Sequence, residues 1–85
     1  MPKVEIYSSM MCGFCHRAKQ LLSQKGVNFD EIPVDMDIEA RATMRGRSGG
    51  TNSVPQIFIG GTHIGGCDEL YMLESLGELD ALLAG

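Results

Sequence analysis

The N-terminal third of the chain limits the fold most, because two strand patterns flank one helical pattern there. Residues 4–7 (VEIY) alternate β-branched and polar residues, which predicts a strand. From Gly13 onward, apolar residues recur with helical spacing, and Gly26 suits the end of that helix. Residues 27–34 (VNFDEIPV) predict a second strand. Strand, crossover helix and strand make a βαβ unit, so the two strands should be parallel.

The middle of the chain predicts a second helix and a loop. Asp37 is a good N-cap for a helix that would end at about Gly46. Gly, Ser and Asn cluster in residues 47–53, which predicts a loop after this helix. The side of the helix that faces the core would consist of Ile38, Ala42 and Met44.

A β-hairpin is predicted next. Residues 56–60 form a short apolar strand pattern, and residues 62–65 form the return strand. The glycine pair at positions 60 and 61 favours a tight turn between them.

Two helical patterns end the chain, at residues 67–76 and 78–84, with Gly77 between them. The predicted order is therefore β-α-β-α-β-β-α-α. This is an α/β fold in which helices cover both faces of a four-stranded mixed sheet. No linker or repeat interrupts residues 1–85, so we expect a single domain.

The charge pattern excludes several classes of partner. The net charge is −4, and all seven Lys and Arg residues lie before position 48. This balance argues against nucleic acid or an anionic membrane surface as the partner. A basic patch that could meet one small anion remains, and it consists of Arg41, Arg45 and Arg47.

The cysteine count and the absence of long apolar runs bear on the compartment. Three cysteines are an odd number, whereas disulfide frameworks of secreted mini-proteins use even numbers. The sequence shows no secretory signal and no run of 18 apolar residues that would predict a transmembrane helix. We therefore expect a reducing, cytoplasmic location, where a close cysteine pair is more often catalytic or metal-binding than structural.

The close pair is Cys12 and Cys15, which sit where a polar loop turns into a helix. A helix N-terminus carries a partial positive charge and unpaired N–H groups, so the Cys12 thiolate should be stabilised there. Cys15 lies one turn on, close enough for a disulfide after modest adjustment, and it belongs to the apolar stripe with Ala18 and Leu22. An exposed attacking thiol and a buried resolving thiol suit thiol–disulfide exchange.

Two other interpretations of the pair stay open at this point. The cysteines could be half of a zinc site, for which His16, His63 and Cys67 are the only further ligands of suitable type. They could also simply fill space in the core. A pair that directly follows a strand and opens a helix favours the redox interpretation.

Two further segments carry features that could bind a ligand. Val54-Pro55 precedes a strand, and a cis bond there would leave the Val54 backbone free to pair with an extended peptide. Gly66-Cys67-Asp68 opens a helix whose N-terminus can hold a carboxylate, while Asp68 could cap the helix or bind an ammonium group. Each has a plainer alternative: a proline that ends a loop, an ordinary first-turn acid, and Cys67 as a small buried apolar residue.

Together these segments resemble the glutaredoxin family of the thioredoxin-like fold, and most closely its small bacterial dithiol members. The resemblance covers nearly the whole chain, from Val4 to about Leu83. It is carried by three motifs in order: CGFCHRAK at 12–19, SVPQIFI at 53–59 and HIGGCDEL at 63–70.

The resemblance implies a glutathione-dependent oxidoreductase that reduces glutathione mixed disulfides and protein disulfides. Cys12 would attack the glutathione sulfur of a glutathionylated protein, and a second glutathione would resolve the product. With protein disulfides, Cys15 would resolve instead and close a redox disulfide with Cys12. The implied partners are glutathione and glutathionylated or disulfide-containing proteins, and the implied state is a monomer.

The resemblance also implies how glutathione is held. Val54 would offer its backbone to the cysteinyl unit beside a cis-Pro55, while Arg41 would meet the glycyl carboxylate. Backbone N–H groups at the start of the third helix, with the Asp68 carboxylate, would hold the γ-glutamyl end. The full implied set is Phe14, Arg41, Ser53, Val54, Pro55, Gly66, Cys67 and Asp68.

The chain departs from the family pattern around the cysteine pair. Ser9 stands where many members have a lysine, and Phe14 lacks the hydroxyl of the commoner tyrosine. The loop before Val54 looks one residue longer and has Thr51-Asn52 where arginine is frequent, so glutathione affinity could be weaker.

Gly13 replaces the commoner proline and opens an alternative function. In this family, glycine or serine there sometimes accompanies a [2Fe–2S] cluster held between two subunits. Cys12 of each subunit and two glutathiones would supply four thiolates, as such clusters require. The alternative is a cluster-bridged dimer that acts as a carrier or sensor. A third class, a binding module without a reactive Cys12, would share the same fold.

Overall fold

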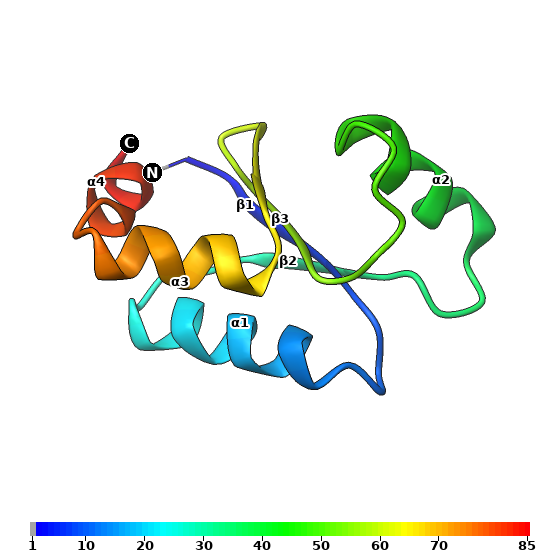
Figure 1. The fold of residues 1–85 in the computed structure, drawn as a ribbon, viewed down its shortest axis with the longest axis horizontal. Helices are drawn as coiled ribbons and strands as arrows, with labels where there is room; N and C mark the ends of the chain where they lie inside the picture. Colours follow the sequence, from blue (N-terminus) through cyan, green and yellow to red (C-terminus); the bar gives the residue numbers. More distant parts are fainter. Residues whose placement is uncertain (1) are drawn as a thin grey trace.

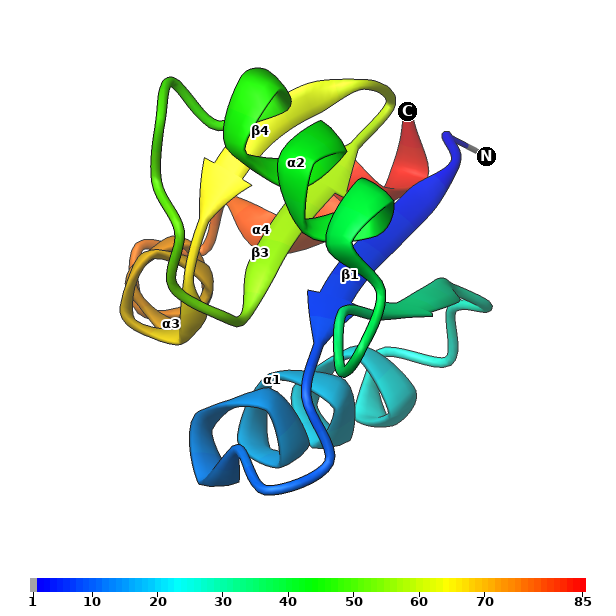
Figure 2. The ribbon, with the colours of Figure 1, turned by 90° about the vertical axis from the view of Figure 1, so that its right-hand side faces the viewer.

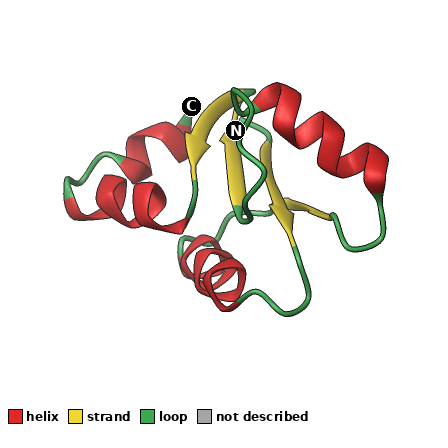
Figure 3. Ribbon diagram, turned by 45° about the vertical axis from the view of Figure 1, so that its right-hand side comes forward, coloured by secondary structure: helices red, strands yellow, loops and turns green. Residues whose placement is uncertain are grey.

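A computed structural model describes residues 2–85 and contains one four-stranded sheet in the order β2-β1-β3-β4. The pair β1–β2 is parallel, and the pairs β1–β3 and β3–β4 are antiparallel. The sheet forms the central layer of the molecule (Figure 3). This confirms the predicted mixed sheet. The strands are β1 (Val4–Ser8), β2 (Asp30–Pro33), β3 (Gln56–Ile59) and β4 (Thr62–Gly65).

Four helices cover both faces of this sheet, as the sequence predicts. One face carries α1, α3 and α4, and the opposite face carries α2 (Figures 1 and 2). The helices are α1 (Gly13–Gln24), α2 (Ile38–Arg47), α3 (Cys67–Ser75) and α4 (Leu79–Ala84). None of the helices in residues 2–85 combines the length and the hydropathy that crossing a bilayer requires.

Side-chain alternation along the strands divides the core between the two faces. In β1, Val4 and Ile6 pack among the residues of α1, α3 and α4, while Tyr7 faces α2. In β3, Ile57 faces the three-helix side and Phe58 faces α2. Successive residues of a strand point to opposite faces, so these short strands contribute to both clusters.

Two local expectations are wrong in detail. The second strand begins at Asp30 and not at residue 27, because Val27 and Phe29 pack against the three-helix core before the ladder starts. In α2, Met44 is buried as predicted, but Ala42 is exposed and the Ile38 side chain is 83% exposed. The helix instead faces the sheet through Ala40 and Met44, which are one turn apart.

An ion pair fixes the end of α2 to the sheet. The Arg47 guanidinium donates to both carboxylate oxygens of Glu5 at 2.8 and 3.1 Å and to the Tyr7 hydroxyl at 3.1 Å. It also lies 4.0 Å from the centre of the Phe58 ring. The hydrogen bond from Arg47 holds the pKa of Glu5 below its usual range, and Glu5 in turn raises the pKa of Arg47. Arg47 therefore belongs to the scaffold and not to a patch that meets a small anion.

Candidate functional site

Cys12 is the N-cap residue of α1, and its sulfur accepts a hydrogen bond from the backbone N–H of Cys15 at 3.0 Å. The first N–H groups of a helix have no acceptor within the helix, so a side-chain atom at the N-cap can satisfy one of them. A negatively charged sulfur is a better acceptor than a neutral one, and it also lies at the positive end of the helix dipole. This position favours the thiolate form of Cys12 once the pair is reduced.

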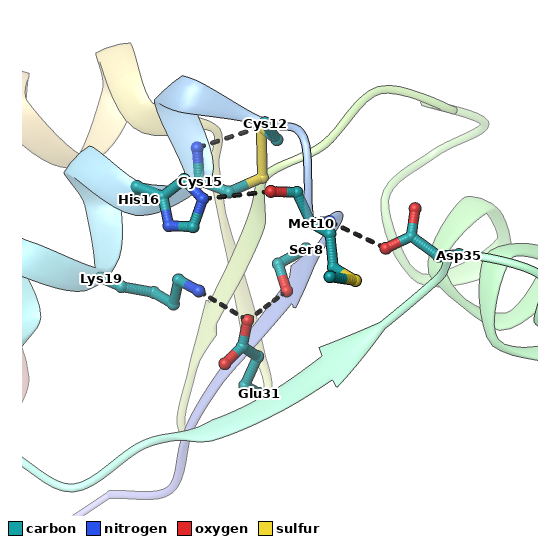
Figure 4. A network of polar contacts seen from close by, with 8 residues as sticks. All are labelled: Ser8, Met10, Cys12, Cys15, His16, Lys19, Glu31 and Asp35. Atoms are coloured by element: carbon teal, nitrogen blue, oxygen red, sulfur yellow. Dashed lines mark hydrogen bonds and ion pairs between the residues drawn. A yellow bond between two sulfur atoms is a disulfide. The ribbon is translucent and has the colours of Figure 1, made fainter.

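Cys12 and Cys15 are joined by a disulfide, with their Cα atoms 5.2 Å apart. This spacing is ordinary for a disulfide. Cys15 is fully buried, whereas Cys12 is partly exposed. The expected asymmetry between an accessible sulfur and a buried one is confirmed, and Figure 4 shows the pair at the start of α1.

Asp35 holds the loop that leads into Cys12. Its carboxylate accepts the Met10 backbone N–H at 2.8 Å (Figure 4). It also accepts the Ser9 hydroxyl at 2.9 Å. These two hydrogen bonds lower the pKa of Asp35. On the other side of the loop, Nε2 of His16 lies 3.2 Å from the Met10 carbonyl oxygen. Ser9, which replaces the family's lysine, thus contributes to the position of the loop.

A second carboxylate joins β1, β2 and α1 below the cysteine pair. Glu31 accepts hydrogen bonds from Lys19 at 2.7 Å and from the Ser8 hydroxyl at 2.6 Å (Figure 4). These bonds, first from Lys19 and then from Ser8, hold the pKa of Glu31 below its usual range. The ammonium group of Lys19 is therefore paired with Glu31, and the N-terminus of α1 supplies positive potential at Cys12.

A cavity of about 440 Å³ opens beside the cysteine pair. Its lining includes every residue that is predicted to contact glutathione except Arg41. The cavity adjoins the redox pair, because the Cys12 sulfur lies 3.6 Å from the carbonyl oxygen of Val54. Its lining comprises Phe14, Thr51, Ser53, Val54, Pro55, Gln56, His63, Ile64, Gly65, Gly66, Cys67, Asp68 and Glu69.

The loop at Val54 presents its backbone to this cavity. The Val54–Pro55 peptide bond is cis, as the family resemblance implies. Within residues 2–85, the Val54 N–H makes no hydrogen bond to another backbone or side-chain group. An extended ligand backbone could therefore pair with it.

Glycines give the far wall of the cavity its shape. Gly65 has φ +122°, and a Cβ atom there would come within 2.7 Å of the Glu69 carboxylate. Gly66 donates its N–H to that same carboxylate at 2.6 Å. The Gly66 N–H, expected to hold glutathione, is thus already paired, which leaves the N–H groups of Cys67 and Asp68 at the first turn of α3. Burial raises the pKa of the Cys67 thiol.

The sequence does not identify Gln56 as a site residue, although Gln56 holds the loop at Ser53 and Val54 that lines the cavity. Its buried amide donates to the Ser53 carbonyl oxygen at 3.0 Å, and its Oε1 lies 2.6 Å from Nε2 of His63. The available signal is its position at the start of an apolar strand, since a buried polar side chain needs hydrogen-bond partners. His63 therefore contacts Gln56 and does not lie with the cysteine pair.

Arg41 lies apart from the cavity. Its guanidinium donates to the Asn52 carbonyl oxygen at 2.8 Å, and that of Arg45 donates to the Asn52 side chain at 3.2 Å. Both arginines border a second cavity of about 420 Å³ near the start of α2. The role of Arg41 in glutathione binding stays a prediction.

A zinc site is not supported by the side chains that the structure places together. Across the described part of the chain, residues 2–85, no three His, Cys, Asp or Glu side chains are grouped as metal ligands. A structural zinc ion needs four ligands in a tetrahedral arrangement.

Comparison with known proteins gives matches over nearly the full length of the chain. The glutaredoxin family model matches residues 4–64. Glutaredoxin 3 of Escherichia coli strain K12 is 57% identical over 83 residues, which cover 98% of this chain and 99% of that protein.

Solved structures agree with these matches. The solution structure of glutaredoxin from Brucella melitensis has a TM-score of 0.85 at 53% identity and covers 98% of this chain and 89% of its own. The crystal structure of the buckwheat glutaredoxin–glutathione complex has a TM-score of 0.87 at 32% identity, with coverage of 98% and 77%. This agreement in sequence and fold, around a cysteine pair at a helix N-terminus, shows that the chain belongs to the glutaredoxin family of thiol–disulfide oxidoreductases.

Proposed function

We propose that this chain, as one domain spanning residues 1–85, reduces glutathione mixed disulfides with Cys12 as the nucleophile and Cys15 as the resolving thiol. The observation that carries the proposal is the N-cap position of Cys12, whose sulfur accepts the Cys15 N–H and adjoins a cavity of suitable lining. A reducing compartment such as the cytoplasm would keep the pair supplied with glutathione.

The chemistry follows from thiol–disulfide exchange. The Cys12 thiolate attacks the glutathionyl sulfur of a protein–glutathione disulfide, so a Cys12–glutathione bond forms as the protein–sulfur bond breaks. The protein leaves as a thiolate and takes a proton from water. A second glutathione then attacks the Cys12-bound glutathione, which releases oxidised glutathione and the free Cys12 thiolate.

Protein disulfides require the second cysteine. Cys12 first forms a mixed disulfide with one sulfur of the substrate, and Cys15 then attacks Cys12 and releases the reduced substrate. The Cys12–Cys15 disulfide that forms is returned to the dithiol by two glutathione molecules, which leave as oxidised glutathione. The Cα separation of 5.2 Å allows this bond to form at the start of α1.

We place glutathione in the 440 Å³ cavity. Its cysteinyl backbone would pair with the unoccupied Val54 N–H, and its γ-glutamyl end would meet the free N–H groups of Cys67 and Asp68. The Asp68 carboxylate, exposed at the rim of the cavity, suits the ammonium group of that end. The related buckwheat protein was solved as a glutathione complex, which supports glutathione as the ligand.

Cysteine variants separate the two roles. We predict that Cys12→Ser abolishes reduction of a small glutathione mixed disulfide, because the hydroxyl is a poor nucleophile. Cys15→Ser should keep much of that activity but lose reduction of an intramolecular protein disulfide. A glutathione-recycling assay with each substrate measures both. Full activity in both variants would contradict the mechanism, whereas a native chain with no activity on either substrate would favour a binding module.

Removal of the Asp68 charge tests the placement of glutathione. We predict that Asp68→Asn raises the KM for a small glutathione mixed disulfide roughly 2- to 10-fold, as expected for the loss of an exposed ion pair worth about 0.4–1.4 kcal/mol. Glu78→Gln is the matched control, because its side chain makes no capping hydrogen bond on α4 and lies outside the cavity. An unchanged KM for Asp68→Asn would exclude this orientation of glutathione.

A second candidate function, a cluster-bridged dimer, is favoured by Gly13. No heavy atom lies within 4 Å of where its Cβ would stand, so the surface beside Cys12 is open. Each chain offers one accessible thiol there, because Cys15 and Cys67 are buried. Cys12 from two chains and the thiols of two glutathiones fit the four-thiolate set of a [2Fe–2S] cluster, which would supply electron-transfer or carrier chemistry when bound.

Reconstitution tests this candidate. Anaerobic incubation with glutathione, iron and sulfide should give a brown dimer with visible absorbance for the native chain and for Cys15→Ser, but not for Cys12→Ser. Gly13→Pro should reduce cluster yield while it leaves reductase activity in place. Absorbance and sedimentation measure both properties, and a colourless monomer from the native chain would rule the cluster function out.

A further inference from the structure

Four large, exposed apolar side chains lie on two segments that hydrogen bonds of Asp35 join within residues 2–85: the loop before Cys12 and residues 36–38. Met10, Met11, Met36 and Ile38 are 79%, 95%, 104% and 83% exposed, and we call them the methionine rim. Large apolar patches on a protein surface usually mark an interaction site. The reductase chemistry described above uses none of these four side chains.

The rim is continuous with the redox pair. Met11 directly precedes Cys12, and the Cys12 N–H donates to the Ser9 carbonyl oxygen at 3.3 Å, which folds this loop beside the nucleophile. Asp35 accepts hydrogen bonds from Ser9 and from Met10, of which Figure 4 shows the second. These bonds join the segment that carries Met36 to the loop that carries the other two methionines.

Met36 is energetically unfavourable in both its backbone conformation and its side-chain exposure. Its backbone has φ +56°, a conformation in which a residue with a Cβ atom is disfavoured by about 1–2 kcal/mol. Its side chain also makes no compensating contact, since it is fully exposed. Asparagine or glycine would avoid both costs, so a fully exposed methionine at this position points to contact with another molecule.

The order of the strands places the rim opposite the glutathione cavity. Cys12 follows β1, which lies in the interior of the sheet between β2 and β3. The cavity is built from β3, β4 and α3 on one side, while residues 35–38 follow β2 on the other. The protein–glutathione disulfide that Cys12 attacks has two halves, and the glutathione half would occupy the β3–β4 side.

The charged groups near the rim make hydrogen bonds to neutral groups of the chain. Asp35 holds Ser9 and Met10, Asp37 caps α2 through the Ala40 N–H at 3.0 Å, and the two arginines of the second cavity contact Asn52. Met36 and Ile38 border that cavity of about 420 Å³. The lining of this cavity combines Val34, Met36 and Ile38 with Asp35, Asp37, Arg41 and Arg45, so it offers apolar contact beside carboxylate and guanidinium groups.

We propose that the methionine rim docks the protein half of the mixed disulfide and selects substrates with apolar side chains next to the glutathionylated cysteine. This inference rests on the proposed placement of glutathione in the cavity. Methionine side chains are flexible and polarisable, so they adapt to different apolar partners. The selection should therefore act on the class of the flanking residues and not on one residue type.

The test compares three substrates in the glutathione-recycling assay. Two are glutathionylated peptides of equal length and net charge, one with Leu and Phe beside the cysteine and one with Ser and Gln. The third is the mixed disulfide of glutathione and 2-mercaptoethanol, which is too small to reach the rim. The variant is Met36→Gln with Ile38→Gln, and its matched control is Met72→Gln with Leu76→Gln, two exposed apolar residues at α3 and its C-cap.

We expect the native chain and the control to prefer the apolar peptide by about five- to tenfold in kcat/KM, as partial burial of one or two apolar side chains would give. The rim variant should reduce this preference to less than about twofold, with no change on the small substrate, which also shows that it is folded. Equal kcat/KM for both peptides in the native chain, or a preference that survives in the rim variant, would overturn the proposal.

Two further outcomes have distinct meanings. Failure of the native chain to turn over the small substrate would refute the proposed glutathione chemistry and not the docking surface alone. A native dimer in sedimentation that becomes a monomer in the rim variant would show that a second copy of this chain covers the rim, which overturns docking of substrate proteins there.

Discussion

The hydrogen bond from the Cys15 N–H to the Cys12 sulfur is the interaction on which the function of this fold depends. It exists because Cys12 ends a loop and caps α1, so the sulfur takes the place of the missing helical acceptor. Other contacts fix the two elements that create this position. Asp35 fixes the loop, and Glu31 joins the strand before it to the helix after it. The scaffold thus delivers one accessible sulfur to the positive end of a helix.

Because β1 lies between β2 and β3 in the sheet, two different surfaces flank the Cys12 sulfur. On the β3–β4 side, backbone N–H groups, glycines and polar side chains line a cavity that suits a small peptide such as glutathione. On the β2 side, the methionine rim offers apolar side chains. A mixed disulfide between glutathione and a protein has the same two-part character. The βαβ unit is responsible for this division, because it places β1 inside the sheet with Cys12 at its end.

Local patterns predict the elements of this fold well and their long-range contacts less well. Strand alternation, helical spacing and capping residues predict the element order, and they place the cysteine pair correctly at the start of α1. These patterns predict the buried side of α2 wrongly, because Ile38 is apolar like a core residue, whereas Ala40 and Met44 face the sheet. Asp35 acts through Ser9 and Met10, which lie 26 and 25 residues away, so composition and spacing alone could not reveal it. For Gln56 the only signal is its position at the start of an apolar strand, since its partners become evident from the structure.

The pKa of Cys12 in the reduced protein tests the central claim most directly. Thiolate absorbance near 240 nm can be followed against pH in the Cys15→Ser variant, which keeps the backbone N–H of residue 15. The remaining cysteine, Cys67, has a raised pKa and should ionise at higher pH. If the helix N-terminus stabilises the thiolate, Cys12 should titrate below about 7.5. Titration near the free-thiol value of about 8.5 would contradict the account.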